Sequence, residues 1–243
     1  MFTWLLEMVL PATCLSCSRP VASPGLCDSC WIKSGLIAPP YCTACGRPQP
    51  FELADEVCTS CSIQPPHLDK IRAVCRYTDI SRQLIIGLKH AGKIHRVPLL
   101  SQMMANAVSD LLPHENTAPM MVIPVPLHWR RYLHRGFNQS AELARNLCRH
   151  YPGQLEFLPN LMLRTQHTSS LAGKSKAQRI KTVADAFSLH PSPPEGWQKR
   201  AILLVDDVMT TGATLNICAD FLRQSGHHST IYGLVFARVM PSS

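Results

Sequence analysis

The sequence lacks an apolar run long enough to cross a membrane, and it is short of acidic residues. Hydrophobic residues make up 46% of the 243 positions, but no stretch reaches the 18 or so consecutive apolar residues of a membrane span. Asp and Glu number 16 against 24 Lys and Arg, which gives a net charge of +8. We therefore expect a globular protein without a transmembrane segment, whose partners or substrates carry negative charge.

The apolar N-terminus lacks the features of an export signal. Residues 1–10 have no basic start, contain Glu7 and are not followed by a small-residue cleavage site. We expect this stretch to be a short amphipathic segment that packs on its own domain.

Basic residues are also scarce in the first quarter of the chain. Residues 1–66 contain three Lys or Arg and five Asp or Glu, for a net charge of −2, whereas residues 67–243 carry +10. Gln64-Pro65-Pro66 has the composition of a linker. We predict two domains, residues 1–66 and 67–243. The charge of the second suits a polyphosphate substrate, nucleic acid or both, although a solvated basic surface would look the same.

Cysteine is abundant, and its spacing indicates metal binding. Eight of the eleven cysteines form four C-x-x-C pairs in the first 61 residues. Each pair places two thiolates on one side of a tight loop, and two loops complete a tetrahedral zinc site. A disulfide framework would need an oxidising compartment. We predict two structural zinc sites, and sequential pairing gives the ligand sets Cys14, Cys17, Cys27, Cys30 and Cys42, Cys45, Cys58, Cys61; an interleaved pairing remains open.

The remaining chain alternates between strand and helix patterns. Strands are expected at residues 71–77, 120–125, 201–206 and 230–238, and helices at 81–90, 98–112, 139–148 and 214–224. This alternation favours an α/β fold with a mostly parallel sheet flanked by helices. The three lone cysteines, Cys75, Cys148 and Cys218, lie in apolar surroundings, and we interpret them as small buried hydrophobic residues.

Residues 202–214 carry the most informative pattern of the chain. Four apolar residues predict a buried strand, which leads to two acids and then to a turn of small residues that opens a helix. Ligands of open α/β sheets bind at this end of a strand, and a helix N-terminus favours a phosphate. The two adjacent carboxylates would repel a bare phosphate but suit hydroxyls and a metal. The expected ligand is therefore a sugar phosphate, with its diol on Asp206 and Asp207.

The same thirteen residues resemble the phosphoribosyl-pyrophosphate (PRPP) motif of the type I phosphoribosyltransferases. The resemblance implies that Asp206 and Asp207, the candidate catalytic residues, meet the ribose 2′- and 3′-hydroxyls, and that Mg²⁺ accompanies PRPP. It further implies that the 5′-phosphate is held by Thr210, Thr211, Gly212, Ala213 and Thr214.

Two basic segments could hold the pyrophosphate of such a ligand or the phosphates of DNA. One follows the strand expected at 120–125, and the other lies in the polar stretch 161–187, which has the character of a lid. Guanidinium groups match phosphate oxygens in pairs, and ammonium groups add charge. The candidates are Arg130, Arg131, Arg135, Lys174, Lys176 and Arg179.

Taken as a whole, the chain resembles the ComF/GntX family. The shared features are the four C-x-x-C pairs, Lys89, Ile123-Pro124-Val125-Pro126-Leu127, Arg135-Gly136-Phe137-Asn138-Gln139 and the motif at 202–214. The resemblance implies a double zinc ribbon followed by a type I phosphoribosyltransferase-like domain in the bacterial cytoplasm. It also implies a role in natural transformation or in the use of DNA as a nutrient, with single-stranded DNA and components of a DNA-uptake channel as partners.

One position departs from catalytic relatives of the superfamily. Purine salvage members place an acidic general base where this chain has Thr210, whose hydroxyl cannot act as a base near neutral pH. Two hypotheses stay open. The protein is either a phosphoribosyltransferase of unknown acceptor, with a base such as His128 or His134, or a non-catalytic module that binds single-stranded DNA and keeps the PRPP fold as a sensor or scaffold.

Overall fold

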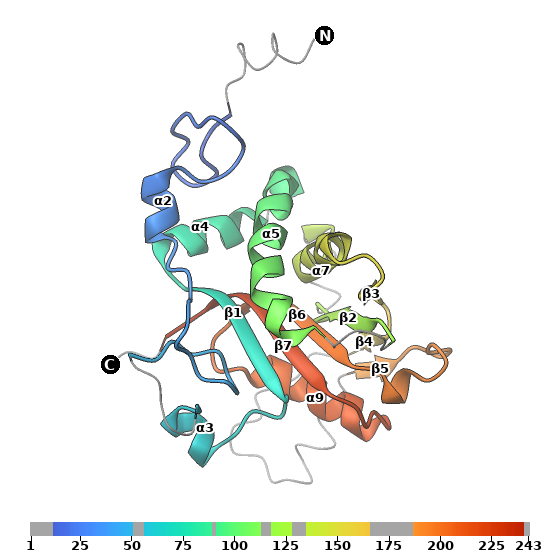
Figure 1. Ribbon diagram of the computed structural model, residues 1–243. Coiled ribbons are helices and arrows are strands. Elements are labelled where there is room, and N and C mark those ends of the chain that lie inside the picture. Colours follow the sequence, from blue (N-terminus) through green and yellow to red (C-terminus); the bar gives the residue numbers. More distant parts are fainter. Residues whose placement is uncertain are drawn as a thin grey trace.

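A five-stranded parallel sheet forms the centre of the protein (Figure 1). The computed structural model describes residues 12–50, 56–88, 91–112 (only the backbone at 91–93), 118–127, 135–165 and 187–240. The strand order is β1-β7-β6-β2-β3. The bounds are β1 Lys70–Arg76, β7 Ile231–Arg238, β6 Ile202–Met209, β2 Met120–Pro124 and β3 Leu155–Phe157.

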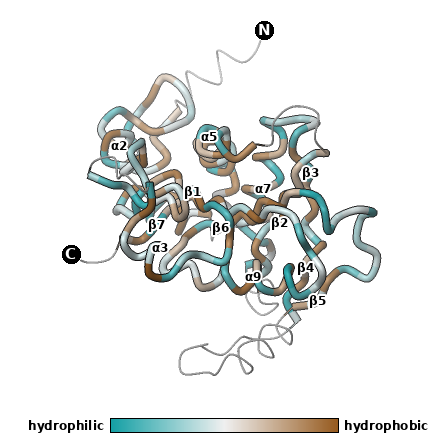
Figure 2. Tube along the Cα trace, turned by 60° about the horizontal axis from the view of Figure 1, so that its bottom comes forward, coloured by the Kyte–Doolittle hydropathy of each residue, from teal (hydrophilic) through white to brown (hydrophobic). Residues whose placement is uncertain are grey.

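Helices cover both faces of this sheet (Figure 1). One face carries α4 (Asp79–Leu88), α5 (Val97–Val108) and α7 (Gln139–His150), and the other carries α9 (Ala213–Gln224). Along β6 the side chains alternate between the two layers: Leu203 and Val205 pack beneath α5 and α7, whereas Ile202 and Leu204 pack on the α9 side. Hydrophobic residues run along the central strands (Figure 2), as expected for a sheet buried on both faces.

The connections of the central strands open a crevice at one end of the sheet. The chain passes from β2 through α7 to β3 on one side, and from β6 through α9 to β7 on the other. Because such crossovers are right-handed, the two helices lie on opposite faces and the loops that leave β2 and β6 diverge. The carboxyl ends of β2 and β6 therefore flank a natural binding position, and Asp206 and Asp207 lie near the end of β6.

The N-terminal region covers the otherwise free edge of β1. The amide N–H groups of Ile37 and Ile71 donate to the carbonyls of Val74 (2.9 Å) and Ala44 (2.8 Å), and Arg76 N–H donates to Gly35 (2.7 Å). An open strand edge invites pairing with other chains. In this protein residues 35–44 occupy it.

Several smaller elements complete the structure. The N-terminal region contains α2 (Asp28–Lys33) and α3 (Thr59–Ile63), and β4 (Met162–Arg164) pairs antiparallel with β5 (Phe187–Leu189). The 3-10 helices are η1 (Ala91–Arg96), η2 (Ser109–Leu111) and η3 (Trp197–Lys199). Among the described helices, none is both long and apolar enough to traverse a bilayer.

The predicted α/β fold with a parallel sheet is confirmed, and the elements expected from residue 71 onward are found within a few residues of their expected bounds. One strand runs further than predicted: β6 ends at Met209 rather than at residue 206, because Val208 and Met209 continue the pairing with β7. The segment expected at residues 1–10 lies outside the described residues.

Candidate functional site

The eight cysteines of the N-terminal region form two clusters of four, Cys14, Cys17, Cys27, Cys30 and Cys42, Cys45, Cys58, Cys61. Within each cluster the Sγ atoms lie within 4.8 Å of one another. Cys17 Sγ is 3.7 Å from Cys27 Sγ, and Cys45 Sγ is 3.8 Å from Cys58 Sγ. Zn–S bonds of about 2.3 Å in a tetrahedron place the sulfurs about 3.8 Å apart, so both clusters fit zinc. The sequential pairing agrees with the structure, and the interleaved one does not.

Hydrogen bonds favour the thiolate form that zinc requires at some cysteines of each cluster. The backbone N–H of Cys27 donates to Cys14 Sγ, and that of Cys58 donates to Cys42 Sγ, each at 3.3 Å. The Ser29 hydroxyl is the largest cause that lowers the pKa of Cys27 to about 6, and the Cys45 thiol is the largest that lowers the pKa of Cys42 to about 4. Burial is the main cause that raises the pKa of Cys30 to about 12 and of Cys61 to about 11, and the hydrogen bond with Cys42 is the main cause that raises the pKa of Cys45. Four thiolates fill every position of each site, so a zinc ion there would be structural.

The two clusters belong to two ribbons that repeat one local structure. We call residues 12–34 the first ribbon and residues 40–62 the second ribbon. In the first, Cys14 N–H donates to the Arg19 carbonyl (2.7 Å), and in the second Cys42 N–H donates to the Arg47 carbonyl (2.8 Å). We call the turn that holds the first two cysteines of each ribbon its knuckle. Each knuckle is followed by an Arg-Pro pair, and the two prolines, Pro20 and Pro48, form equivalent β-bridges with Thr13 and Tyr41.

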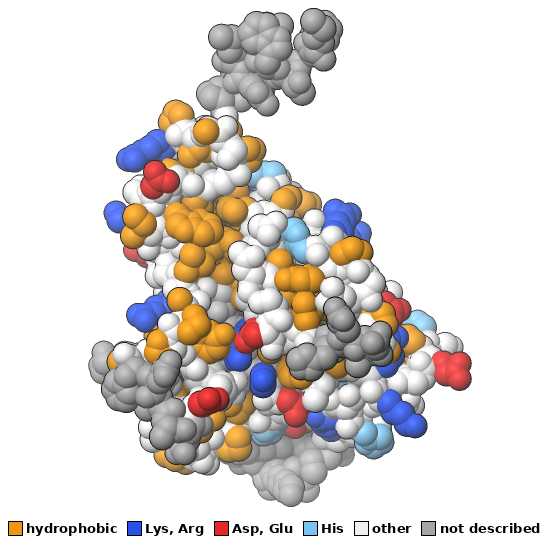
Figure 3. Space-filling model, in the orientation of Figure 1, with side chains coloured by type: hydrophobic (Ala, Val, Ile, Leu, Met, Phe, Trp, Pro, Cys, Tyr) orange, Lys and Arg blue, Asp and Glu red, His pale blue; other side chains and the backbone are white. Residues whose placement is uncertain are grey.

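The two ribbons dock on different parts of the protein. In the first ribbon the Ser16 hydroxyl donates to Gln83 of α4 (2.7 Å), and Ile80 of α4 packs against its cysteines. Figure 3 shows hydrophobic side chains gathered over the part of the surface that contains α2, where Trp31 and Ile32 are exposed. The second ribbon lies instead against β1, next to the carboxyl end of β7, where Arg238 donates to the Cys45 carbonyl.

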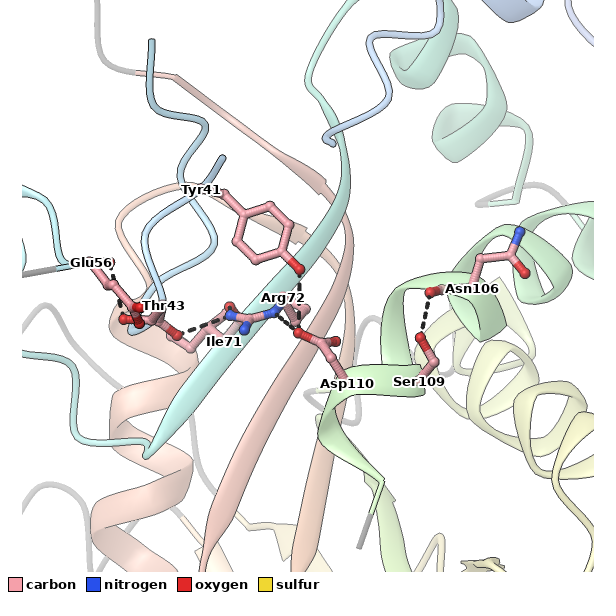
Figure 4. Close-up of polar contacts among 8 residues, drawn as sticks. All are labelled: Tyr41, Thr43, Glu56, Ile71, Arg72, Asn106, Ser109 and Asp110. Atoms are coloured by element: carbon pink, nitrogen blue, oxygen red, sulfur yellow. Dashed lines mark hydrogen bonds and ion pairs between the residues drawn. The ribbon is translucent and has the colours of Figure 1, made fainter. Parts of the chain in front are cut away.

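A buried arginine holds the second ribbon against the sheet (Figure 4). Arg72 of β1 donates from Nη1 to the Thr43 carbonyl at 2.9 Å and from Nε to Asp110 Oδ2 at 2.6 Å. Its guanidinium lies 4.7 Å from the centre of the Tyr41 ring, and the Tyr41 hydroxyl donates to the same Asp110 oxygen at 3.3 Å. One side chain thus joins the second ribbon, β1 and the end of the α5 region.

The two acids of β6 are positioned by the first residues of α7. Asn138 caps this helix by accepting from Ser140 N–H (3.0 Å), and its amide donates to the Val125 carbonyl (3.1 Å). The next two side chains then reach β6: Gln139 Nε2 donates to Asp207 Oδ2 (3.1 Å), and Ser140 Oγ donates to Asp206 Oδ1 (2.9 Å). The Arg-Gly-Phe-Asn-Gln motif (residues 135–139) therefore has a structural role, because it supplies the cap and the first residue of the helix that orients both acids.

The environment of Asp206 makes its charge sensitive to pH. Burial is the main cause that raises its pKa to about 7, and the neighbouring Asp207 carboxylate adds to this. The Asp207 amide and the Ser140 hydroxyl oppose the rise by donating to the ionised form. Asp207 itself is only 7% exposed. A cation, or hydroxyl groups that donate to these oxygens, would stabilise the charged pair.

The turn after β6 forms a small hollow at the start of α9. Gly212 adopts a left-handed conformation (φ 80°) as the N-cap of this helix, and Thr211 Oγ1 accepts from Ala213 N–H at 3.3 Å. The hollow has a volume of about 60 Å³ and is lined by Asp206 and residues 208–215. A helix N-terminus directs unpaired N–H groups and the positive end of its dipole at an anion. We refer to residues 210–214 as the phosphate loop, after the role that the sequence predicts for them.

The structure brings some predicted site residues together and leaves others undescribed. Asp206 and the phosphate loop line one hollow, and the backbone N–H of Asp207 donates to Asp206 beside it. The residues that lie outside the described part of the chain are Arg130, Arg131, Lys174, Lys176, Arg179, Lys89, His128 and His134. Arg135 is part of the same network, since its Nη1 donates to Gln139 Oε1 (3.2 Å). Sequence reasoning did not assign the roles of Gln139 and Ser140; the signal available was the capping residue Asn138 directly before them.

The three lone cysteines behave as expected for buried hydrophobic residues. Cys75 and Cys218 are fully buried, and Cys148 is partly buried. Burial raises the pKa of Cys75 and of Cys148 to about 12, and it also raises that of Cys218. Such thiols are protonated at neutral pH and are poor nucleophiles.

Comparisons with known proteins agree with both parts of the chain. Residues 5–62 match the double zinc ribbon domain. Competence protein F of Haemophilus influenzae is 32% identical over 228 residues, which cover 92% of this chain and 96% of that protein. DNA utilization protein YhgH of Escherichia coli K12 is 28% identical (90% and 94% covered), and competence protein ComFC of Bacillus subtilis is 27% identical (88% and 84%).

Solved structures give a fainter likeness. A hypoxanthine phosphoribosyltransferase from Trypanosoma cruzi superposes with a TM-score of 0.35 and 12% identity, covering 65% of this chain and 80% of that one. A likeness of this size supports no argument about function.

Proposed function

The chain belongs to the family of competence protein F, and from this premise we propose that it binds PRPP and acts in DNA uptake or in the use of DNA as a nutrient. The relatives' names connect the family with competence and DNA utilisation. The residues at the ends of β2 and β6 are the basis for naming PRPP as the ligand, and the relatives' names are the basis for the cellular process.

One observation carries the PRPP proposal: two hydrogen-bonded acids lie next to a hollow at the N-terminus of α9. Ser140 and Gln139 orient Asp206 and Asp207 at 2.9 and 3.1 Å, and Asp206 lines the hollow. A sugar phosphate matches this arrangement, because its phosphate suits the helix N-terminus and its hydroxyls suit the carboxylates. Carboxylate oxygens are also ligands that Mg²⁺ prefers, so Asp206 and Asp207 would hold the ion that accompanies a pyrophosphate.

If the protein is a phosphoribosyltransferase, its residues act mainly by positioning. The acids hold the ribose and the phosphate loop holds the 5′-phosphate, while the bond from C1 to pyrophosphate breaks and a bond to the acceptor forms. Charge that develops on the ribose in the transition state is stabilised by the two carboxylates. Thr210 supplies no general base, so an acceptor that needs no deprotonation is favoured.

The alternative is a module that binds single-stranded DNA without catalysis. The charge of +10 on residues 67–243 and the names of the relatives favour it. Binding through phosphates releases counterions, so the affinity would fall steeply as salt is raised. Under this alternative, PRPP would be a regulator and no pyrophosphate would be released.

Calorimetric titration with PRPP and Mg²⁺ tests the proposal directly. We expect saturable binding by the zinc-loaded protein and a loss of at least tenfold in affinity for Asp206→Asn combined with Asp207→Asn, because the acceptors for the diol are weakened. Asp79→Asn, which removes an exposed acid of α4, is the matched control and should bind normally. Normal binding by the double variant would refute the placement of the site.

The same titration at several pH values gives a second readout. The pKa of Asp206 is raised to about 7. In the proposed complex, the ribose hydroxyl groups of PRPP donate hydrogen bonds to the ionised form of this carboxylate. The affinity should therefore rise with pH up to about 7 and level off above it. Because a phosphate of PRPP also ionises near pH 6, Asp206→Asn provides the reference. The wild-type protein should show the steeper dependence, and equal slopes would contradict the role of Asp206.

A further inference from the structure

A cavity of about 580 Å³ lies between the second ribbon and the phosphate loop. Its walls come from three parts of the chain that are far apart in sequence: the second ribbon with the following residues 64–66, the turn that connects β6 to α9, and the end of β7. Its volume is within the range of about 300–1,000 Å³ that is usual for small-molecule sites.

Two arginines without acidic partners face this cavity. Arg238 is only 8% exposed, and its Nε is buried without a hydrogen-bond acceptor. Arg47 also lines the cavity with a buried, unpaired Nε, although its Nη1 reaches Ser60 Oγ at 3.5 Å. Among the described residues neither arginine forms an ion pair, and no described carboxylate lines the cavity. Two guanidinium groups that line a cavity without a carboxylate partner give it a positive charge, which indicates a place for an anion.

The zinc sites alone do not account for these arginines. Arg238 lies beside Cys45, where its charge would also offset that of the zinc-bound thiolates. The repeat provides a comparison, however: Arg19 holds the position in the first ribbon that Arg47 holds in the second, and Arg19 is exposed on the surface. A zinc knuckle of this kind therefore does not require a partly buried arginine at that point.

The remaining walls of the cavity are mainly apolar. Pro65, Pro66, Met209 and Met240 line it, together with the amides of Gln64 and Asn216. Apolar walls accept the faces of a flat ring, and amide groups can hydrogen-bond to the edge of such a ring. The ligand that matches the whole cavity combines an anionic group with a flat heterocycle.

We propose that this cavity binds a nucleotide, with the phosphate on Arg47 and Arg238 and the base against the proline and methionine side chains. The second ribbon would then be a wall of a ligand site as well as a zinc-stabilised module. Residues 209–213 line both the cavity and the hollow of the phosphate loop, so the nucleotide would lie beside PRPP. The nucleotide site rests on the proposed function only for this neighbour and can be tested without PRPP.

The test is calorimetric titration of the zinc-loaded full chain with thymidine 5′-monophosphate, thymidine and inorganic phosphate. We expect the nucleotide to bind at least tenfold more tightly than either fragment. Arg47→Met, which keeps the length of the side chain but removes its charge, should weaken nucleotide binding at least tenfold. Arg19→Met, the matched change in the first ribbon, should leave it unchanged. Equal binding by wild type and Arg47→Met would overturn the proposal.

Two further measurements distinguish the nucleotide site from the PRPP site. The variant Asp206→Asn with Asp207→Asn should lose PRPP but keep the nucleotide; loss of the nucleotide here, with normal binding by Arg47→Met, would place its phosphate in the hollow and refute the cavity. Zinc content of two ions per chain shows that each variant is folded.

Competition by a short oligothymidylate with a 5′-phosphate, but not by one with a 5′-hydroxyl, would identify a DNA end as the source of the bound nucleotide. Competition by neither would identify a free nucleotide, and both results support the site.

Discussion

The two zinc ribbons repeat the same backbone hydrogen bonds around their cysteines, yet they occupy different positions in the protein. The same hydrogen bonds close both knuckles, at 2.7 and 2.8 Å, and the third cysteine donates to the first at 3.3 Å in each. The first ribbon packs on α4 at the periphery, whereas the second packs on the start of β1 and borders the phosphate loop. The same metal module thus occurs twice, and only the second copy lines the proposed ligand site.

One position of the repeat records this difference. Ser18 and Gly46 both have positive φ, 60° and 68°, directly after the second cysteine of the knuckle. A serine is therefore tolerated by the knuckle itself. A Cβ on Gly46, however, would lie 2.8 Å from the Ile71 carbonyl oxygen and 3.3 Å from Arg72 Cα. The glycine in the second ribbon is required by its close contact with β1, and the first ribbon has no such contact.

The largest difference between the two ribbons is expected when one cysteine ligand is removed from each zinc site in turn. Cys17→Ser and Cys45→Ser should each reduce the metal content to one zinc per chain. We expect Cys45→Ser to cost on the order of 5 kcal/mol of folding free energy and to abolish binding of nucleotide, because a wall of its cavity is lost. Cys17→Ser should retain ligand binding. Metal analysis with calorimetry checks this, and equal loss of binding in both variants would show that the ribbons are not functionally distinct.

A smaller difference in stability is expected from substitutions at Gly46 and at Ser18, its equivalent in the first ribbon. Gly46→Ala should lower the free energy of unfolding by about 2–4 kcal/mol, since it combines an unfavourable positive φ with a clash against β1. Ser18→Ala, at the equivalent position, should change it by less than about 0.5 kcal/mol. Urea unfolding of the zinc-saturated proteins measures both. A similar cost in the two variants would mean that the knuckle, and not the docking, restricts this position.

The smallest expected effects concern the polar contacts that dock each ribbon. Arg72→Met removes the hydrogen bonds to Thr43 and Asp110 while keeping most of the packing, and should cost about 2 kcal/mol. Ser16→Ala removes the exposed contact between the first ribbon and Gln83, and should cost about 0.5 kcal/mol or less. The same unfolding assay compares them. A larger cost for Ser16→Ala would contradict the view that the second ribbon is the more firmly attached.

The sequence predicts those features of the protein that repeat or alternate locally. The C-x-x-C spacing predicts both zinc clusters, and the apolar run before Asp206 predicts a central strand with the acids near its end. Strands of three residues, such as β4, are too short to show periodicity and were not predicted. Contacts between distant segments were also missed: Ser140 and Asp206 are 66 positions apart, and Arg238 meets Cys45 across 193. Only the packing of the sheet brings such residues together.

The docking of the second ribbon on β1 also has a consequence for the order of folding during synthesis. Arg72 contacts a residue only 29 positions earlier, in a ribbon that has already left the ribosome when β1 appears. The sheet partner of β1 comes much later, since Cys75 reaches Phe236 across 161 positions. Chains fold from the N-terminus as they emerge, and exposed strand edges promote aggregation. A folded ribbon can therefore pack on one edge of β1 before β7 has been made, and we expect zinc depletion during synthesis to leave that edge open to pairing with other chains.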